Sequence, residues 1–118
     1  MSYQDRMYAL GLATADQLRE SLEAPNTSLL DVRSMDEIEA TGKFEREGRS
    51  WFQTPCSPFA CEELDCLTDR MFPDKEAPII VYCKSGRRAS KAKEILEGKG
   101  YKKVLNAGGY DDLLAMQL

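Results

Sequence analysis

Apolar residues in this chain gather into short runs that alternate with segments of helical spacing. The run with the most β-branched residues is Pro78–Tyr82, PIIVY, and its composition predicts a buried strand. Ser28–Val32, SLLDV, is a second short apolar run between turn-forming residues and predicts another buried strand. A third, shorter strand is expected at Lys103–Leu105.

Helices are expected between these strands. A capping box at Thr14–Gln17 precedes a helix over 15–23 that ends before Pro25. A second capping box at Ser34–Glu37 opens a short helix that stops near Gly42. The other elements predicted from apolar spacing and turn formers are helices over Ala60–Met71, Arg88–Gly98 and Asp111–Gln117, a loop over Lys43–Pro58 and a turn at Gly108-Gly109.

This alternation of strands and helices indicates an α/β fold, with a central, mostly parallel sheet and helices on both faces. The 118 residues are enough for a single domain over 1–118 and too few for two. Functional sites in such folds lie outside the carboxyl ends of the strands. Because the strongest strand ends at Cys83, chemistry is expected there.

Charge and the lack of one residue type narrow that chemistry. The net charge is −4, but the segment 83–103 holds eight basic residues against two acidic ones, so it carries +6 and the remainder −10. This asymmetry predicts one anion-attracting site and argues against a surface for nucleic acid. The chain has no histidine, which excludes Ser-His-Asp and Cys-His nucleophiles and zinc bound through histidine. A catalytic cysteine must therefore be ionised by its electrostatic surroundings alone.

The segment Cys83–Ser90, CKSGRRAS, joins the strongest strand to the best-defined helix. Backbone N–H groups and the positive end of the helix are expected to face the sulfur and, with three basic side chains, to lower the pKa of the thiol below its free value of about 8.5. The alternative is a core cysteine beside a solvated helix start, but the coincidence of strand, cysteine, glycine, basic pair and helix favours a reactive site. The residues expected to bind substrate are Lys84, Ser85, Gly86, Arg87 and Arg88.

Two further motifs flank this strand and loop in order. The three together are Leu29–Arg33 with Glu37-Ile38 and Gly42, then Ile79–Cys83 with Lys84–Ser90, then Gly98–Tyr101 with Val104–Gly109. From Ala13 to Leu114 the chain resembles the rhodanese family. The resemblance implies a rhodanese-like fold in which Cys83 is the nucleophile that forms a persulfide. It also implies that residues 84–88 hold the sulfane sulfur and a donor anion.

Two segments differ from the family's usual pattern. A His-Ile-x-Gly-Ala stretch commonly follows the glycine that matches Gly42, whereas this chain has Lys43–Trp51, KFEREGRSW. That stretch often borders the pocket in the family, so the difference is expected to affect substrate choice. Leu113 stands where the family usually has an aromatic residue, which implies a difference in packing.

The implied function is transfer of a sulfane sulfur from thiosulfate, or another persulfide or thiosulfonate donor, to a thiol or cyanide through a persulfide on Cys83. Each step is attack of a thiolate on sulfur with an anionic leaving group, so no cofactor or metal is expected. One alternative is a non-catalytic rhodanese-like binding module, which need not keep the cysteine. Another is a phosphatase or arsenate reductase, whose larger loop carries arginine at the sixth position after the cysteine, where this chain has Ala89.

The expected partners are a small anionic sulfur donor and a thiol acceptor, either a small molecule or a protein. Neither nucleic acid nor membrane is expected. The first ten residues, MSYQDRMYAL, lack the pattern of a secretory signal. A cytoplasmic location is therefore expected, or an organelle if a targeting peptide has been removed.

Several other residues have both a structural and a functional interpretation. Cys56, Cys61 and Cys66 are spaced five apart, and unpaired thiols in a reducing compartment are favoured over a resolving thiol or a second persulfide carrier.

Asp31 and Arg33 can support the pocket if their strand runs parallel to the one that ends at Cys83. A pair between Arg33 and Glu37 that braces the second helix is the preferred interpretation. The aromatic residues expected in the core rather than in a pocket wall are Trp51, Phe59 and Tyr110.

Overall fold

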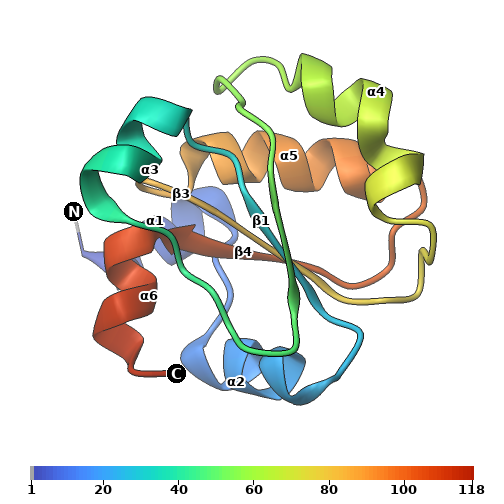
Figure 1. Ribbon diagram of the computed structural model, residues 1–118. Coiled ribbons are helices and arrows are strands. Elements are labelled where there is room, and N and C mark those ends of the chain that lie inside the picture. The colour runs from blue at the N-terminus through green and yellow to red at the C-terminus, as the bar shows by residue number, and fades with distance from the viewer. Residues whose placement is uncertain (1) are drawn as a thin grey trace.

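Four parallel strands and six helices make up residues 2–118, which the computed structural model describes. The chain alternates between the two kinds of element after a first pair of helices (Figure 1). In order, the elements are α1 (Tyr3–Leu10), α2 (Ala15–Glu23), β1 (Ser28–Asp31), α3 (Met35–Thr41), β2 (Ser50–Gln53), α4 (Glu62–Met71), β3 (Ile79–Cys83), α5 (Arg87–Gly98), β4 (Val104–Gly109) and α6 (Tyr110–Met116).

The strands lie in the order β2-β1-β3-β4, and all three pairings are parallel. The two central strands, β1 and β3, are the apolar runs that the sequence marked as buried. The carboxyl ends of the strands share one edge of the sheet, where Asp31 pairs with Tyr82 and Cys83 pairs with Gly109. The predicted α/β fold with a parallel sheet is therefore confirmed, and Cys83 lies at the expected edge.

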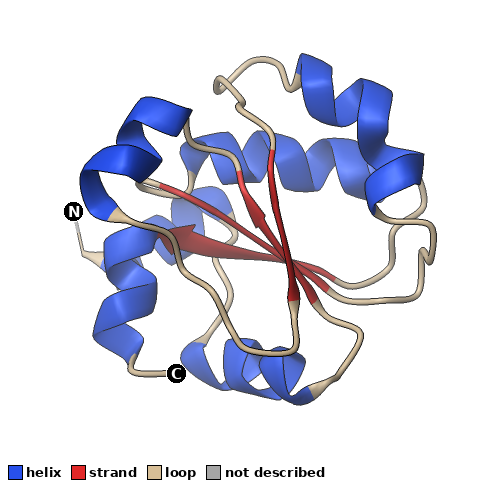
Figure 2. Cartoon of the chain, in the orientation of Figure 1, coloured by secondary structure: helices blue, strands red, loops and turns tan. Residues whose placement is uncertain are grey.

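Helices cover both faces of the sheet, with α4 and α5 on one face and α2 and α6 on the other (Figure 2). Side chains of a strand alternate between its two faces. Along β3, therefore, Val81 and Cys83 lie in the core beside α5, whereas Ile80 and Tyr82 lie in the core beside α2 and α6. This alternation turns the cysteine side chain toward the N-terminal turns of α5.

Both predicted capping boxes are present. Thr14 and Gln17 exchange side-chain and backbone hydrogen bonds at the start of α2, and Ser34 and Glu37 do so at the start of α3. These contacts span three residues each, so local sequence was sufficient to predict them.

One element prediction was wrong, and two short elements were not predicted. The segment 43–58 is mostly loop, as expected, but it contains β2, an edge strand whose four residues are exposed or half-buried, so it shows little of the apolar signal of a buried strand. Gly108 and Gly109 end β4 instead of forming a turn. No element was predicted where α1 forms; none of its residues is buried, so it lacks the apolar face on which such a prediction depends. None of the helices in residues 2–118 is long and apolar enough to cross a membrane.

Candidate active site

The loop Lys84–Gly86 connects the end of β3 to the start of α5 and folds back over the cysteine. The backbone N–H of Gly86 donates a hydrogen bond to Cys83 Sγ at 3.0 Å. Gly86 is the N-cap of α5 and has φ +103°, a conformation that L side chains rarely adopt. A Cβ there would also lie 2.8 Å from Leu12 Cδ2 and 3.2 Å from Gly108 Cα. The tight turn that brings the amide to the sulfur therefore requires glycine.

Cys83 itself is enclosed, with 1% of its surface exposed. The sequence suggested a nucleophile that faces several amides. Among residues 2–118, the Gly86 amide is the one backbone donor within hydrogen-bonding distance of the sulfur. The difference arises because the pleat of β3 directs the side chain under the first turn of α5, against Ala89 and Val32 in the same apolar cluster.

Of the three basic residues in the loop and the first turn of α5, Arg88 is already paired. Its guanidinium donates to both carboxylate oxygens of Glu37, at 2.6 and 2.8 Å. The hydrogen bonds from Arg88 lower the pKa of Glu37 to about 2, and those to Glu37 raise the pKa of Arg88, with a smaller contribution from Cys83 nearby. The pair links α3 to α5, so the predicted substrate-binding role of Arg88 competes with a structural one.

Lys84 and Arg87 are exposed, and neither forms an ion pair in the part of the chain that the structure describes. Ser85 is half-buried and turns its carbonyl oxygen toward α1, where Arg6 donates to it at 2.8 Å. Two of the predicted substrate-binding residues are thus exposed cations, and Ser85 belongs to a backbone turn that Arg6 holds through its carbonyl.

Asp31 and Arg33 form a buried ion pair at 2.7 Å. Arg33 also donates to Thr41 Oγ1 and to the Gly42 carbonyl, and its guanidinium lies 4.6 Å from the ring centroid of Tyr110. The preferred prediction that Arg33 pairs with Glu37 was wrong, because Asp31 is two residues away on the same strand end and Glu37 is taken by an arginine from α5.

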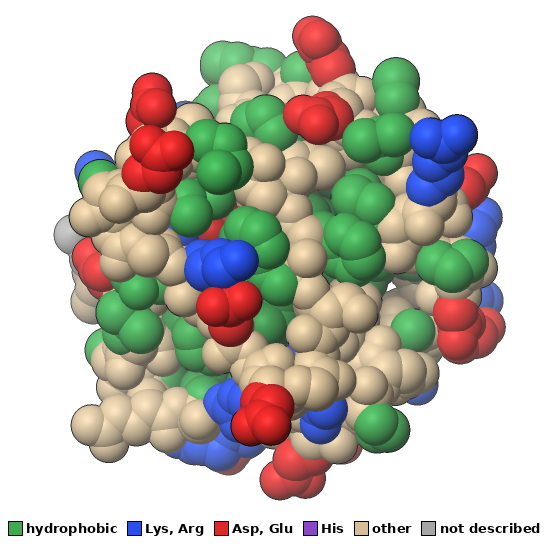
Figure 3. Space-filling view, viewed as in Figure 1, with side chains coloured by type: hydrophobic (Ala, Val, Ile, Leu, Met, Phe, Trp, Pro, Cys, Tyr) green, Lys and Arg blue, Asp and Glu red, His purple; other side chains and the backbone are tan. Residues whose placement is uncertain are grey.

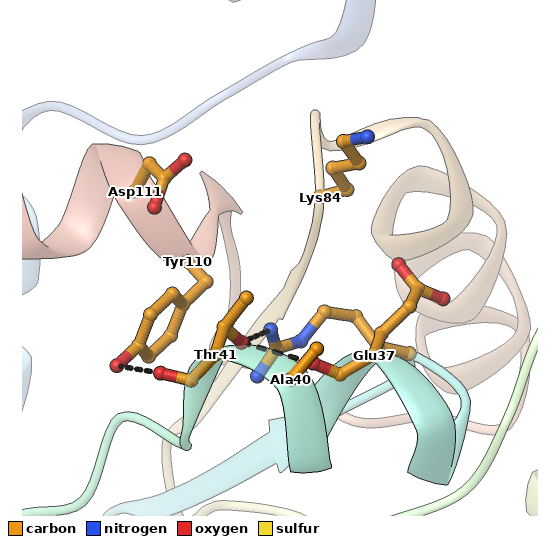
Figure 4. Close-up of a pocket in the computed structure, with 7 residues that line it drawn as sticks. Glu37, Ala40, Thr41, Lys84, Tyr110 and Asp111 are labelled. Atoms are coloured by element: carbon orange, nitrogen blue, oxygen red, sulfur yellow. Dashed lines mark hydrogen bonds between the residues drawn. The ribbon is translucent and has the colours of Figure 1, made fainter.

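A pocket with a volume of about 170 Å³ opens beside the loop, between α3, the loop and the start of α6 (Figure 4). Lys84 and Asp111 extend at its rim from opposite sides, and neither Cys83 nor Lys43–Trp51 lines it. Phe44 and Trp51 instead pack against the core beside α2 and α6. The residues that line the pocket are Arg33, Glu37, Ala40, Thr41, Lys84, Tyr110 and Asp111.

The three aromatic residues expected in the core have different outcomes. Trp51 and Tyr110 are half-buried and pack against the core beside α2 and α6, as predicted, and Tyr110 also lines this pocket. Phe59 is 83% exposed, so the prediction was wrong for that residue. Trp51 is half-buried and donates its indole N–H to the Tyr82 hydroxyl at 2.9 Å.

The end of β4 supports the loop closely. Asn106 Nδ2 donates to the Gly86 carbonyl at 2.9 Å, and a Cβ on Gly109 would lie 1.9 Å from the Lys84 carbonyl oxygen. Glycine at position 109 therefore allows the end of β4 to approach the loop closely. No individual role was predicted for Asn106, because its contact with Gly86 depends on the neighbouring strand that the fold supplies.

The four cysteines fall into two classes. Cys56 and Cys61 form a disulfide, so the prediction of unpaired thiols was wrong for these two; Cys66 and Cys83 are free, and Cys66 is exposed. A hydrogen bond from Ser57 N–H to the Ala60 carbonyl closes the intervening loop and brings the two cysteines together.

The basic segment 83–103 does not form one anion site. The Lys103 carbonyl accepts a hydrogen bond from the Ile79 N–H at the start of β3. This end of the segment therefore lies at the amino ends of the strands, whereas Cys83 lies at their carboxyl ends. On the face shown in Figure 3, basic and acidic side chains are interspersed. The lysines of the segment that pair with acidic residues are Lys91 with Glu94, Lys93 with Glu97 and Lys99 with Asp65.

Comparison with known proteins places this geometry in a family. The family model of the rhodanese-like domain matches residues 14–115. A rhodanese with anions from E. coli is 32% identical, with a TM-score of 0.56 over 73% of this chain and 89% of that chain. The polysulfide-sulfur transferase homodimer of Wolinella succinogenes is 30% identical, with a TM-score of 0.68 over 91% of this chain and 74% of that chain.

Curated relatives include the tRNA uridine(34) hydroxylases of Yersinia enterocolitica and Yersinia pestis. Each is 33% identical over 95 residues, which are 80% of this chain and 25% of the relative. The chain thus spans about a quarter of the length of these relatives. The family model covers most of the chain, and the chain belongs to the rhodanese-like domain family.

Proposed function

We propose that this protein is a sulfurtransferase that carries a sulfane sulfur as a persulfide on Cys83. The observation that carries the proposal is the Gly86 amide, held 3.0 Å from Cys83 Sγ at the N-terminus of α5. The chain has no histidine that could act as a general base toward the thiol. An N–H donor and the positive end of a helix stabilise the sulfur anion instead.

With thiosulfate as donor, the Cys83 thiolate attacks the outer sulfur. The new S–S bond forms as the bond between the two donor sulfurs breaks, and sulfite leaves with the electron pair. The terminal sulfur of the persulfide retains one negative charge, which the loop stabilises. An acceptor thiolate or cyanide then attacks that sulfur, forms an acceptor persulfide or thiocyanate, and returns the Cys83 thiolate. No proton, metal or external electron is required in either step.

Two features of the site favour small anionic donors. Lys84 on the loop and Arg87 at the start of α5 are exposed cations, so a donor anion meets uncompensated positive charge there. Because Cys83 is 1% exposed, a narrow donor with a terminal sulfur reaches it more readily than a bulky one. Thiosulfate meets both conditions, and so does polysulfide, after which the Wolinella relative is named.

The other interpretations fit the chain less well. A phosphatase or arsenate reductase needs a longer loop than the one that closes on Cys83 at Gly86. A binding module does not require the cysteine. Hydroxylation of tRNA is the activity named for relatives about three times as long, and the charge of −4 gives no support for a nucleic-acid partner.

The acceptor, a small thiol or a protein, is part of the same proposal. A cytoplasmic location was expected from the first ten residues, which lack the pattern of a secretory signal. A disulfide between Cys56 and Cys61 is more typical of an oxidising compartment, so the fold gives that location no support.

The direct test is mass spectrometry of the intact protein after exposure to thiosulfate. We expect one added sulfur atom that maps to Cys83, its loss on treatment with cyanide, and no addition in Cys83→Ser. Cys66→Ser is the matched control and should retain the full addition, because Cys66 is a free thiol on α4 outside the loop. Phosphate-ester hydrolysis and arsenate reduction are assayed beside it. Sulfur transfer at the wild-type rate by Cys83→Ser would overturn the proposal.

A further inference from the structure

We propose that Arg6, in the N-terminal helix α1, is a positioning residue that orients and polarises the Ser85–Gly86 peptide toward the sulfur of Cys83. The inference rests on the proposed function for its consequence in catalysis. Its structural basis is a continuous set of contacts from α1 to the sulfur.

One peptide group connects the two residues. Arg6 Nη1 donates to the Ser85 carbonyl oxygen at 2.8 Å, and the Gly86 N–H donates to Cys83 Sγ at 3.0 Å. The Ser85 C=O and the Gly86 N–H belong to the same planar unit and, in a trans peptide, point in opposite directions. A guanidinium on the oxygen therefore fixes the direction of the N–H and strengthens it as a donor, since hydrogen bonds in series polarise one another.

Arg6 is itself held in place. It donates to both carboxylate oxygens of Asp112, at 2.8 and 2.7 Å, and the two side chains are only 14% and 17% exposed. Asp112 Oδ2 also accepts the Gly109 N–H at 2.7 Å. The same carboxylate thus joins α1 to the end of β4, where Gly109 lies against the loop.

The charge of Asp112 decides how Arg6 acts. At this distance the carboxylate largely cancels the long-range field of the guanidinium. What remains is the directed hydrogen bond to Ser85, so the effect on Cys83 depends on the shape of the guanidinium as well as on its charge. Arginine can donate to a carboxylate and to a carbonyl at once from its planar fork, whereas lysine lacks that geometry.

The contact is an addition to the family's core. Arg6 lies outside residues 14–115, which match the rhodanese-like domain, and α1 lies beside the tip of β4 and the start of α6 (Figure 1). Tyr3, one turn before Arg6, donates its hydroxyl to the Ala13 carbonyl at 2.5 Å and so ties α1 to the body of the domain. None of the residues that line the pocket beside the loop comes from α1.

The test compares Arg6→Met, Arg6→Lys and a matched control, Arg19→Met, in a Cys66→Ser background. Arg19 is an exposed arginine on α2 that also pairs with an aspartate, so it reports the generic cost of losing an arginine. Three quantities are measured: kcat and KM with thiosulfate, the pH profile of Cys83 alkylation by iodoacetamide, and the melting temperature.

Of the three hydrogen bonds that Arg6→Met removes, the one to the Ser85 carbonyl acts on the loop, and its loss should lower kcat about tenfold. KM should stay near wild type because Arg6 does not line the pocket, and the alkylation profile should move to higher pH. The kcat and alkylation profile of Arg6→Lys should lie between those of wild type and Arg6→Met, and those of Arg19→Met should match wild type. A merely structural role would lower the melting temperature and leave the alkylation profile of the folded protein in place.

A folded Arg6→Met protein with the wild-type kcat and alkylation profile would overturn the inference. If that variant does not fold, Arg6→Gln replaces it; its neutral amide can still donate to Ser85, and wild-type values there count against the role of the charge. If wild type transfers no sulfur, the proposed function fails, whereas the alkylation profiles still test whether Arg6 acts on Cys83.

Discussion

Replacing Gly109 with alanine is expected to move the loop that follows Cys83. A Cβ at position 109 would lie 1.9 Å from the Lys84 carbonyl oxygen and 2.6 Å from its carbonyl carbon, both backbone atoms. Such contacts are essentially never shorter than 3.0 Å, so the two backbones must separate by at least 1.1 Å, the difference between 3.0 and 1.9 Å. Lys84 directly follows Cys83, so the shift reaches the residues that surround the sulfur.

This displacement lowers both stability and rate. Overpacking of this kind costs about 1–3 kcal/mol. An unfolding entropy of roughly 0.25 kcal/mol/K for a chain of this length converts that cost to a fall in melting temperature of about 4–12 °C. The rate of persulfide formation should fall further, by on the order of 100-fold, because a misplacement of about 1 Å in a catalytic group has an effect of that size.

Calorimetry gives the melting temperature, and mass spectrometry after thiosulfate addition gives the rate, measured well below both melting temperatures. Gly98→Ala is the matched control, since a Cβ at the end of α5 meets nothing within 4 Å. It should leave the rate unchanged and raise stability slightly, because glycine is a poor helix former. A Gly109→Ala protein that forms the persulfide as fast as wild type would refute the reasoning, whatever its melting temperature.

Three further outcomes are expected. The arginine partner lowers the pKa of Glu37 from its ordinary value of 4.5 to about 2. The ionised carboxylate therefore stabilises the fold at pH values above 4.5, and this contribution is lost as the pH falls from 4.5 toward 2. Urea unfolding of Glu37→Gln should therefore show a smaller loss over that range than wild type, and an equal loss would contradict the ion pair. The disulfide joins cysteines five residues apart, and chain entropy gives it about 2 kcal/mol; the double variant Cys56→Ser, Cys61→Ser should lose that much, and an unchanged urea midpoint would count against the crosslink. Cys83 should react much more slowly than exposed Cys66 with a bulky aromatic disulfide reagent, followed by peptide mapping, and equal rates would contradict its burial.

The residues that the sequence predicted well are those whose signals are local. The apolar run that ends at Cys83 forms β3, and the basic helix after it forms α5. The two capping boxes formed as predicted because each closes over three residues. The order of strands and helices was sufficient to predict a parallel sheet and to place the cysteine at its carboxyl edge.

The edge strand β2 is an element that local sequence signals did not predict. Its residues are half-buried or exposed, and it becomes a strand because β1 offers a partner along its whole length. The Cys56–Cys61 disulfide depends in the same way on the path of a loop. In each case spacing along the chain was compatible with more than one structure.

The sequence by itself determined the place of Cys83 at the end of its strand, the turn that follows it and the kind of fold that presents them. The tertiary structure alone decided which side chains support that turn. Arg6 and Ser85 are 79 residues apart, Arg6 and Asp112 are 106 apart, and Glu37 and Arg88 are 51 apart. Contacts at such separations leave no periodicity or local motif in the sequence, because their partners meet only after the sheet and its helices have packed.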